Sequence, residues 1–336
     1  MLKRIVWIFA SIVGTGFFLQ ACAAYQPGPV SITIDRGQEG RIYFTSQDAY
    51  DFADVLKGQA QSRIIHGDLT LPPPDFPLRG GIILSHGSGG PSGLHERTGA
   101  WLAKQGLAVF RLDHFGPRNV SSTARDQIKI TAQGMLVDVI AARQLLATHP
   151  DLDAAKIGHM GWSKGGIVAL SSAVDRLSKY AGAEMPLAFA VAYYPFCGFG
   201  LGTEKVSTPL LIQIGAEDNW TPAAPCQTLV DAWQSQGAPV EIDVYPNARH
   251  GFDSRLGNSE FSGAVTVRDT TSSCTLSVDE NGRTVSLDGS YTLSTPEGRI
   301  AYLQACGTRG VTYGGNPTAK DASWARIKAF IDKHLP

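Results

Sequence analysis

The chain has 336 residues, of which 43% are hydrophobic and 18% are charged, and its formal net charge is -1. This is the composition of an ordinary globular protein, with enough length for one large domain. A net charge so close to zero gives no electrostatic reason to expect nucleic-acid binding, and the sequence contains no basic stripe that would suggest it.

The first residues have the pattern of an export signal. Lys3 and Arg4 precede an apolar segment at 5–19, which is too short for a stable membrane span of about 20 residues. The segment ends in Leu19-Gln20-Ala21-Cys22, which resembles the lipobox of bacterial lipoproteins. That resemblance implies cleavage before Cys22 and a lipid on the new amino terminus.

A lipid on Cys22 would make residues 1–21 a signal peptide and would anchor an exported, periplasmic chain to a membrane. No aspartate follows the cysteine, which in a Gram-negative cell favours the outer membrane. The alternative is an ordinary signal peptide cut near Ala24, with Cys22 discarded. Residues 22–40 contain proline and glycine and are predicted to form a tether, so we expect the folded domain to span 41–336.

Beyond this tether, apolar strand-like runs alternate with helical stretches. Strands are predicted at 62–71, 81–85, 107–112, 156–161, 187–193, 209–215 and 240–245. Helices are predicted at 94–105, 131–146, 163–174 and 223–236, and a last helix begins at Asn316-Pro317, a cap followed by proline. This alternation predicts an α/β fold, with a mostly parallel central sheet and helices on both faces.

One segment, at about 255–309, interrupts the alternation. It is rich in Ser, Thr, Gly and Asn and shows no helical period, so we interpret it as an insertion. Apolar residues alternate on either side of Asn281-Gly282, which predicts a short β-hairpin. Two interpretations stay open: the insertion shapes the mouth of a pocket, or it decorates the surface without a role in catalysis.

Four cysteines follow Cys22, and an exported chain meets an oxidising compartment. Four cysteines allow three pairings. We favour Cys197–Cys226 and Cys274–Cys306, because the first pair flanks one strand–helix unit and the second closes the insertion. A free catalytic thiol at Cys197 is the rival interpretation, although no nucleophile turn surrounds it.

The most specific motif is Gly161-Trp162-Ser163-Lys164-Gly165-Gly166, at the end of the strand predicted at 156–161. The pattern G-x-S-x-G between a strand and a helix is the nucleophile elbow of α/β-hydrolases. The turn is so tight that the flanking positions must be glycine. It lifts the Ser163 hydroxyl to the amino end of the next helix, where the helix dipole and free N–H groups favour a developing negative charge.

A serine hydroxyl needs a base within hydrogen-bond reach, and the base needs a carboxylate to orient it. In α/β-hydrolases these residues follow in the order Ser, Asp or Glu, His. Asp218 and His250 follow the strands at 209–215 and 240–245, in loops where open α/β sheets place their active sites. Alternatives stay open for both residues. Asp218 only caps a helix, or Glu217 is the carboxylate that orients the base. His250 is a loop residue without a role in catalysis.

The oxyanion of an acyl-transfer intermediate also needs donors. The residue after the nucleophile, Lys164, supplies one backbone N–H by its position. We expect the second from Ser88, in the loop His86-Gly87-Ser88-Gly89-Gly90 after the strand at 81–85. A phosphate-binding loop is the rival interpretation, but no Gly-Lys-Ser/Thr ends this one. His159, inside the elbow strand, is expected to be packed in the core.

Together these motifs resemble the dienelactone hydrolase family of α/β-hydrolases. The resemblance covers about 81–253, resumes at 310–335, and rests on five segments: His86-Gly87-Ser88-Gly89-Gly90, Asp113-His114-Phe115-Gly116-Pro117-Arg118, Gly161-Trp162-Ser163-Lys164-Gly165-Gly166, Gly215-Ala216-Glu217-Asp218 and His250-Gly251-Phe252. It implies a Ser or Cys nucleophile, an Asp and a His, which match Ser163, Asp218 and His250. The founding enzymes are cytosolic and use cysteine, so the serine favours general ester hydrolysis. The insertion and the signal are foreign to them.

Three further residues are candidates for substrate contact: His114, Arg118 and Trp162. Asp113, His114 and Arg118 end the strand that precedes the elbow strand, so we expect them to approach the same rim. The planar guanidinium of Arg118 is suited to clamp a substrate carboxylate. The alternative is a structural Arg–Asp pair that holds the loop.

The sequence therefore predicts a serine hydrolase that cleaves a small ester or lactone through an acyl-enzyme. The alternatives are a peptidase or acyltransferase on the same residues, or a non-catalytic envelope lipoprotein that uses the fold as a binding module. No cofactor or metal is implied, because no cluster of His, Cys and Asp has metal-ligand spacing. The sequence carries no signal for an oligomeric state.

Overall fold

The structure, a computed structural model, describes residues 25–335, so the predicted signal peptide and Cys22 lie outside it. The first eight strands are β1 (Gly40–Asp48), β2 (Gln61–Thr70), β3 (Gly80–Ser85), β4 (Leu107–Asp113), β5 (Ile157–Trp162), β6 (Ala190–Tyr193), β7 (Leu210–Gly215) and β8 (Val240–Tyr245). They form one eight-stranded sheet in the order β1-β2-β4-β3-β5-β6-β7-β8. Strand β2 runs antiparallel to β1 and β4, and the others pair in parallel.

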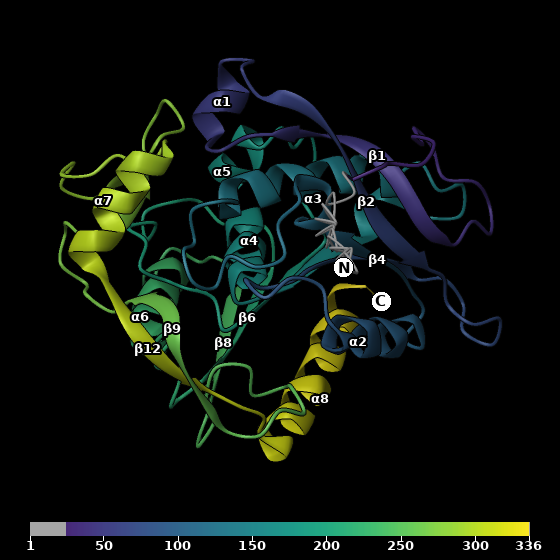
Figure 1. The fold of residues 1–336 in the computed structure, drawn as a ribbon. Coiled ribbons are helices and arrows are strands. Elements are labelled where there is room, and N and C mark those ends of the chain that lie inside the picture. The colour runs from purple at the N-terminus through teal and green to yellow at the C-terminus, as the bar shows by residue number, and fades with distance from the viewer. Residues whose placement is uncertain (1–24, 336) are drawn as a thin grey trace, which may run out of the picture.

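Helices cover both faces of this sheet (Figure 1). The α-helices of the described residues are α1 (Phe52–Leu56), α2 (Gly93–Ala103), α3 (Ala132–Leu146), α4 (Lys164–Ala173), α5 (Asp175–Tyr180), α6 (Ala223–Gln234), α7 (Pro296–Cys306) and α8 (Pro317–His334), and α7 lies apart from this sheet. Helices α2 and α8 meet through Trp101 and Trp324, whose ring centroids are 4.9 Å apart. Helices α3 and α4 pack together and onto the central strands. The predicted α/β architecture is confirmed.

The central strands are buried along their whole length. Every residue of β3, β5 and β7 is buried, because layers of helices leave neither face of these strands to water. Such strands appear in the sequence as continuous apolar runs, which is why the pattern located them within a residue or two. Strand β1 is not predicted by the sequence pattern: only alternate residues such as Ile42 and Phe44 face the core.

The segment predicted as a tether lies against the domain over its described part. Ile34 is only 2% exposed, and its N–H donates a hydrogen bond of 2.9 Å to Thr148 Oγ1. The Tyr25 hydroxyl lies 2.9 Å from His66 Nδ1. The described part of the predicted tether therefore packs on the domain, because burial of the apolar Ile34 side chain is favourable.

The 255–309 segment, together with the chain just beyond it, forms a layer of its own beside the sheet (Figure 1). Strands β9 (Ser259–Val267) and β12 (Gly307–Tyr313) pair antiparallel as a two-stranded ribbon. Along the chain, the residues between these two strands form first the predicted hairpin, of β10 (Leu276–Val278) and β11 (Thr284–Ser286), and then α7. Helix α7 is not predicted by the sequence, although Thr295 caps it and Pro296 occupies its first turn.

The hairpin buries polar side chains and exposes an apolar one. Thr284 and Ser286 are buried, whereas Leu287 is 54% exposed. The burial of Thr284 follows from its contact with the Asp51 carboxylate. This carboxylate accepts hydrogen bonds from the Thr284 N–H at 2.7 Å, the Thr284 hydroxyl at 2.9 Å and the Ser294 hydroxyl at 2.6 Å. A saturated buried carboxylate thus fixes the face that the hairpin presents to the domain.

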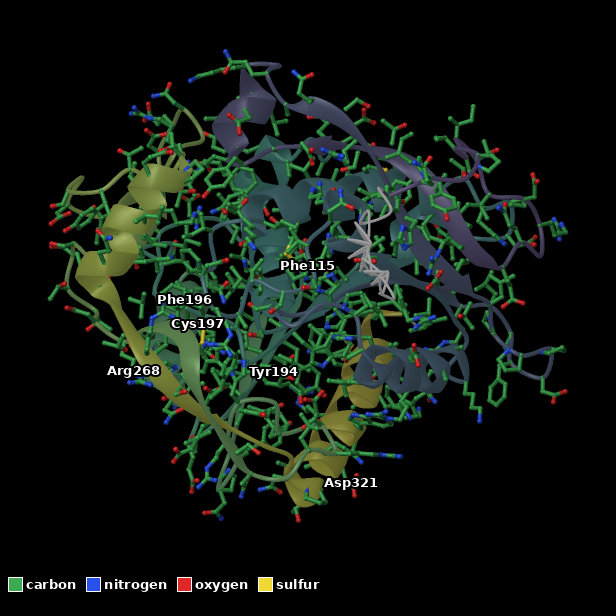
Figure 2. The ribbon with its side chains drawn as sticks, viewed as in Figure 1. Phe115, Tyr194, Phe196, Cys197, Arg268 and Asp321 are labelled. Carbon is green, nitrogen blue, oxygen red and sulfur yellow. A yellow bond between two sulfur atoms is a disulfide. The ribbon has the colours of Figure 1, made fainter. Side chains whose placement is uncertain are left out.

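Both favoured cysteine pairs are bonded. Cys197–Cys226 links the loop after β6 to α6, and Cys274–Cys306 links the start of the hairpin to the end of α7. The sulfur bond at Cys197 is visible in Figure 2. Cys197 is therefore not a free thiol. Among residues 25–335, no helix combines the length and apolarity that a membrane crossing requires.

Removing the Cys274–Cys306 bond is expected to destabilise the 255–309 segment, whose own core is small. The bond closes a separation of 32 residues, so replacing both cysteines by alanine should cost about 2 to 4 kcal/mol of unfolding free energy. Urea unfolding of the oxidised parent and the double variant measures the difference. Equal midpoints and slopes would show that the bond does not restrain this segment.

Candidate active site

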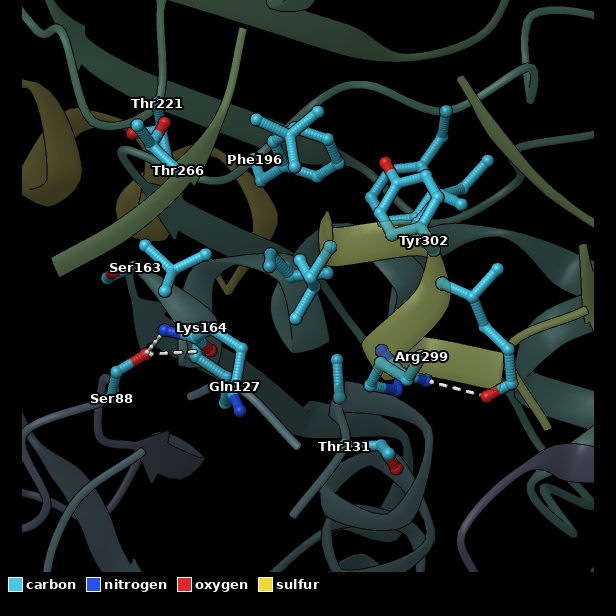
Figure 3. Close-up of a pocket in the computed structure, with 18 of the residues that line it drawn as sticks. Ser88, Gln127, Thr131, Ser163, Lys164, Phe196, Thr221, Thr266, Arg299 and Tyr302 are labelled. Atoms are coloured by element: carbon cyan, nitrogen blue, oxygen red, sulfur yellow. Dashed lines mark hydrogen bonds between the residues drawn. The ribbon is translucent and has the colours of Figure 1, made fainter. Parts of the chain in front are cut away.

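Ser163 occupies a strained turn between β5 and α4. Its backbone has φ 53° and ψ -112°, a conformation that residues other than glycine rarely adopt. A Cβ at Gly161 would lie 2.0 Å from the Gly165 carbonyl oxygen, and a Cβ at Gly165 would lie 2.1 Å from the Ser85 carbonyl oxygen. Backbone contact therefore demands both glycines of the motif. The turn places the Ser163 side chain in the wall of a cavity (Figure 3).

The side chains of Ser163, His250 and Asp218 form one continuous hydrogen-bonded array. His250 Nε2 lies 3.0 Å from Ser163 Oγ, and His250 Nδ1 lies 2.8 Å from Asp218 Oδ2. The structure thus brings together three residues that are far apart in the chain. This geometry allows the imidazole to accept the serine proton while the carboxylate holds the Nδ1–H tautomer.

Asp218 is buried and well supplied with donors. Its Oδ1 accepts hydrogen bonds from the backbone N–H groups of Trp220 at 2.9 Å and Thr221 at 2.8 Å. The Thr221 hydroxyl lies 3.0 Å from Oδ2. These contacts fix the position of the carboxylate beside His250. Asp218 therefore both caps the turn before α6 and contacts His250. Glu217, by contrast, is more exposed and lies 3.4 Å from Arg249.

Two aromatic rings pack against His250. The ring centroids of Tyr194 and Trp220 lie 4.6 Å and 4.7 Å from that of the imidazole. The Tyr194 hydroxyl in turn donates to Asp253 at 2.8 Å. The histidine is thereby held in place and largely shielded from water. Sequence reasoning missed both rings, although Trp220 stands only two residues after Asp218.

The loop that carries Ser88 comes close to the nucleophile. A Cβ at Gly87 would lie 3.2 Å from Ser163 Cβ, and Ser88 lines the same cavity as Ser163 and Lys164. Among the described residues, no hydrogen bond is formed by the backbone N–H of Ser88 or of Lys164. Gln127 Nε2 donates to the Ser88 hydroxyl at 3.0 Å (Figure 3). Both N–H groups are thus available to an oxyanion.

The three candidate substrate contacts lie away from the cavity, which corrects the expectation that they reach it. Arg118 binds the buried Asp138 with two hydrogen bonds, of 2.8 Å and 3.0 Å. His114 is fully buried against the same carboxylate at 2.8 Å. Trp162 is buried and donates its indole N–H to Asp253 at 2.7 Å. A buried charge needs a partner, so the structural Arg–Asp pair is the arrangement formed.

Behind the Ser88 loop runs a buried chain of polar side chains. From Asp138 it passes to His114 at 2.8 Å, to Ser85 at 3.1 Å, to His159 at 2.9 Å and to Ser172 at 3.1 Å. His159 is fully buried, as expected, and burial lowers its pKa to about 3. Because Ser85 ends β3 directly before the Ser88 loop, this chain anchors that loop.

The cavity beside Ser163 has a volume of about 130 Å³, and the 255–309 segment forms much of its wall. Sequence reasoning missed Gln127 and the wall residues of this segment. Arg299 in particular was missed because it lies on α7, which the sequence does not predict. Lys164 is buried in the wall and donates to the Ile130 carbonyl oxygen at 2.6 Å, and burial lowers its pKa to about 7. Within residues 25–335, no group of three or more His, Cys, Asp or Glu side chains is arranged to hold a metal ion.

Comparison with known proteins agrees with this architecture. A dienelactone hydrolase-like promiscuous phosphotriesterase from metagenomic libraries is similar in fold, with a TM-score of 0.50 and 14% identity over 88% of this chain and 100% of the other. A thermophilic esterase from Thermogutta terrifontis matches with a TM-score of 0.43 and 17% identity over 62% of this chain and 83% of the other. The family model of the dienelactone hydrolase family matches residues 70–272, so the chain belongs to the dienelactone hydrolase family of α/β-hydrolases.

Proposed function

We propose that the protein is a serine hydrolase that cleaves small carboxylic esters or lactones through an acyl-enzyme. One observation carries this proposal: His250 lies 3.0 Å from the Ser163 hydroxyl and 2.8 Å from the Asp218 carboxylate. Membership of a hydrolase family supports it. The glycine-bordered, strained turn at Ser163 also supports it, because a binding module has no need of such a turn.

In the proposed reaction, Ser163 Oγ attacks the ester carbonyl carbon while its proton passes to His250 Nε2. The carbonyl oxygen becomes an oxyanion and accepts hydrogen bonds from the Ser88 and Lys164 N–H groups. The ester C–O bond then breaks, and His250 returns the proton to the leaving alkoxide oxygen. A water molecule attacks the acyl-serine by the same route, which releases the acid and restores the serine.

We also propose that the chain is exported, with 1–21 as signal peptide, a lipid on Cys22 and the folded domain anchored to the outer membrane. Two disulfides support an oxidising compartment. The lipobox-like sequence supports the anchor. Mass spectrometry of the protein from a membrane fraction tests both: the proposal requires a mature amino terminus at a lipid-modified Cys22.

A fluorophosphonate probe tests the serine directly, because it reacts with an activated serine hydroxyl. We expect the intact protein to be labelled at Ser163 and Ser163→Ala to remain unlabelled. Ser88→Ala is the matched control: its hydroxyl also faces the cavity, but the proposed role belongs to its backbone N–H, so labelling should persist. Absence of labelling in the folded parent protein would favour the non-catalytic binding module.

A further inference from the structure

The cavity that contains Ser163 is closed on its other side by the 255–309 segment. Leu276 comes from its hairpin, Leu293 from the chain before α7, and Arg299 and Leu303 from α7 itself. Figure 3 shows Ser163 and Arg299 on opposite sides of the pocket, separated by apolar side chains. Any substrate with its carbonyl at Ser163 and its acyl part in this cavity therefore extends over an apolar surface toward Arg299.

Two basic side chains, Arg299 and Lys164, line the cavity, and no Asp or Glu is among the lining residues that the structure describes. Arg299 carries a permanent charge, whereas Lys164, whose pKa burial lowers to about 7, is only partly protonated near neutral pH. Among residues 25–335, Arg299 forms no ion pair, and its Nε is buried without a hydrogen-bond partner. Within the described residues it forms one long hydrogen bond, from Nη2 to the Leu293 carbonyl oxygen at 3.3 Å, and its guanidinium carbon lies 5.5 Å from the centroid of the Tyr50 ring.

Arg299 has no carboxylate partner among the described residues of the wall. The Asp51 carboxylate, which reaches the same segment, is already saturated by Thr284, Ser294 and the Phe52 N–H. The Lys164 side chain donates to the Ile130 carbonyl oxygen. A half-buried guanidinium without a counter-ion is costly unless a ligand supplies the anion.

We propose that the cavity selects esters whose acyl chain is apolar along its length and ends in a carboxylate, with Arg299 as the residue that determines this specificity. The inference rests on the proposed function and names its substrate class: monoesters of dicarboxylic acids. The ester carbonyl lies at Ser163, the methylene chain lies along the apolar wall, and the distal carboxylate accepts hydrogen bonds from the Arg299 guanidinium.

Gln133 provides the rival chemistry. Its Nε2 donates to Thr284 Oγ1 at 3.0 Å, which leaves its buried Oε1 in the wall without a partner. A neutral terminal amide would offer an N–H to that oxygen and a carbonyl to Arg299. The permanent charge of Arg299 favours the carboxylate instead, because a guanidinium can bind the anion through two charge-assisted hydrogen bonds.

The test compares p-nitrophenyl monoesters of equal acyl length that end in a carboxylate, a carboxamide or a methyl group, from glutarate to suberate. We expect kcat/KM to be at least about 10-fold higher for the carboxylate at the best length. Arg299→Gln should lower kcat/KM for the carboxylate substrate by about 10- to 100-fold, mainly through KM, and change the methyl-ended ester less than about 2-fold. Arg299→Lys should retain part of the preference.

Arg283→Gln is the matched control, because Arg283 belongs to the same segment but is exposed and paired with Asp279; it should change nothing. A preference for the amide, or equal losses on charged and neutral esters in Arg299→Gln, would overturn the inference while ester turnover upheld the proposed function. Binding of free adipate to Ser163→Ala, measured by calorimetry, tests the Arg299 inference independently of ester turnover. Adipate should bind, and should do so far more weakly once Arg299→Gln is added. No turnover and no fluorophosphonate labelling would instead overturn the function.

Discussion

Replacing Ser163 by alanine is expected to lower kcat on p-nitrophenyl acetate by about 10⁴- to 10⁶-fold. The change removes the atom that would form the covalent bond, while Ser88 and Lys164, whose N–H groups are the proposed oxyanion donors, still line the cavity. The residual rate should therefore exceed that of the reaction in water. Steady-state kinetics of the purified parent and variant measure the difference.

The fold of this variant should be almost unchanged. Alanine tolerates the φ of 53° about as well as serine, and within residues 25–335 the hydroxyl's one hydrogen bond is to His250. Thermal unfolding should therefore give a midpoint within a few degrees of the parent's. His250→Gln serves as the second variant, because it should lower kcat by a similar factor if the two residues act as one unit. Unchanged turnover in the folded Ser163→Ala variant would reject the proposed nucleophile.

Replacing Asp138 by alanine is expected to destabilise the protein by about 3 to 5 kcal/mol, the largest stability effect that we expect from one substitution. Asp138 is fully buried and accepts hydrogen bonds from Arg118, His114 and the Ser46 hydroxyl. Its removal leaves Arg118 buried with only the partly exposed Asp48 as an ion partner. Urea unfolding measures the loss.

Asp48→Ala is the matched control for this experiment. Asp48 binds the same guanidinium at 2.7 Å, but its carboxylate is partly open to solvent, so we expect a loss of about 1 kcal/mol. A loss for Asp138→Ala no larger than for Asp48→Ala would show that burial of the pair does not govern its contribution.

The same carboxylate predicts how stability depends on pH. Burial alone would raise the pKa of Asp138, but the charge of Arg118 and the hydrogen bond from His114 outweigh it and lower that pKa to about 2. A carboxyl group whose pKa is lower in the folded than in the unfolded state stabilises the fold above its unfolded pKa. This contribution should be lost as the pH falls from about 4 toward 2. Asp138→Asn should lack it, so the parent and this variant should converge in stability in acid.

The sequence located best those elements whose pattern comes from burial on both faces. Strands β3, β5 and β7 are short and mostly apolar, and they alternate with helical stretches, as is typical of a parallel sheet covered on both faces. Strand β1 and helix α7 were missed for the opposite reason: each buries only a few of its residues, such as Ile42 in β1 and Tyr302 in α7. Their periodicity is too weak to separate from that of a polar loop, and tertiary contacts complete them.

Unlike the nucleophile elbow, the residues that line the cavity could not be predicted from local spacing. Arg118 and His114 stand at a strand end, which suggested the rim of the sheet, yet they turn inward because Asp138 on α3 supplies a buried counter-charge. Arg299 lines the cavity from a segment that the sequence offered as either a pocket wall or a surface decoration. Neither outcome follows from local pattern, since both depend on which distant residue arrives opposite the side chain.

The amino-acid sequence by itself determined the α/β architecture and the turn that exposes Ser163, because both depend on local spacing and on the order of elements. It favoured the two cysteine pairs that are formed and indicated the family by resemblance. Only the tertiary structure decided the 3.0 Å and 2.8 Å contacts of His250, the inward course of Arg118 and the cationic cavity wall. These features depend on packing between residues that are far apart in the chain. Whether a charged side chain is buried, and which loops come close to it, cannot be decided from the sequence pattern alone.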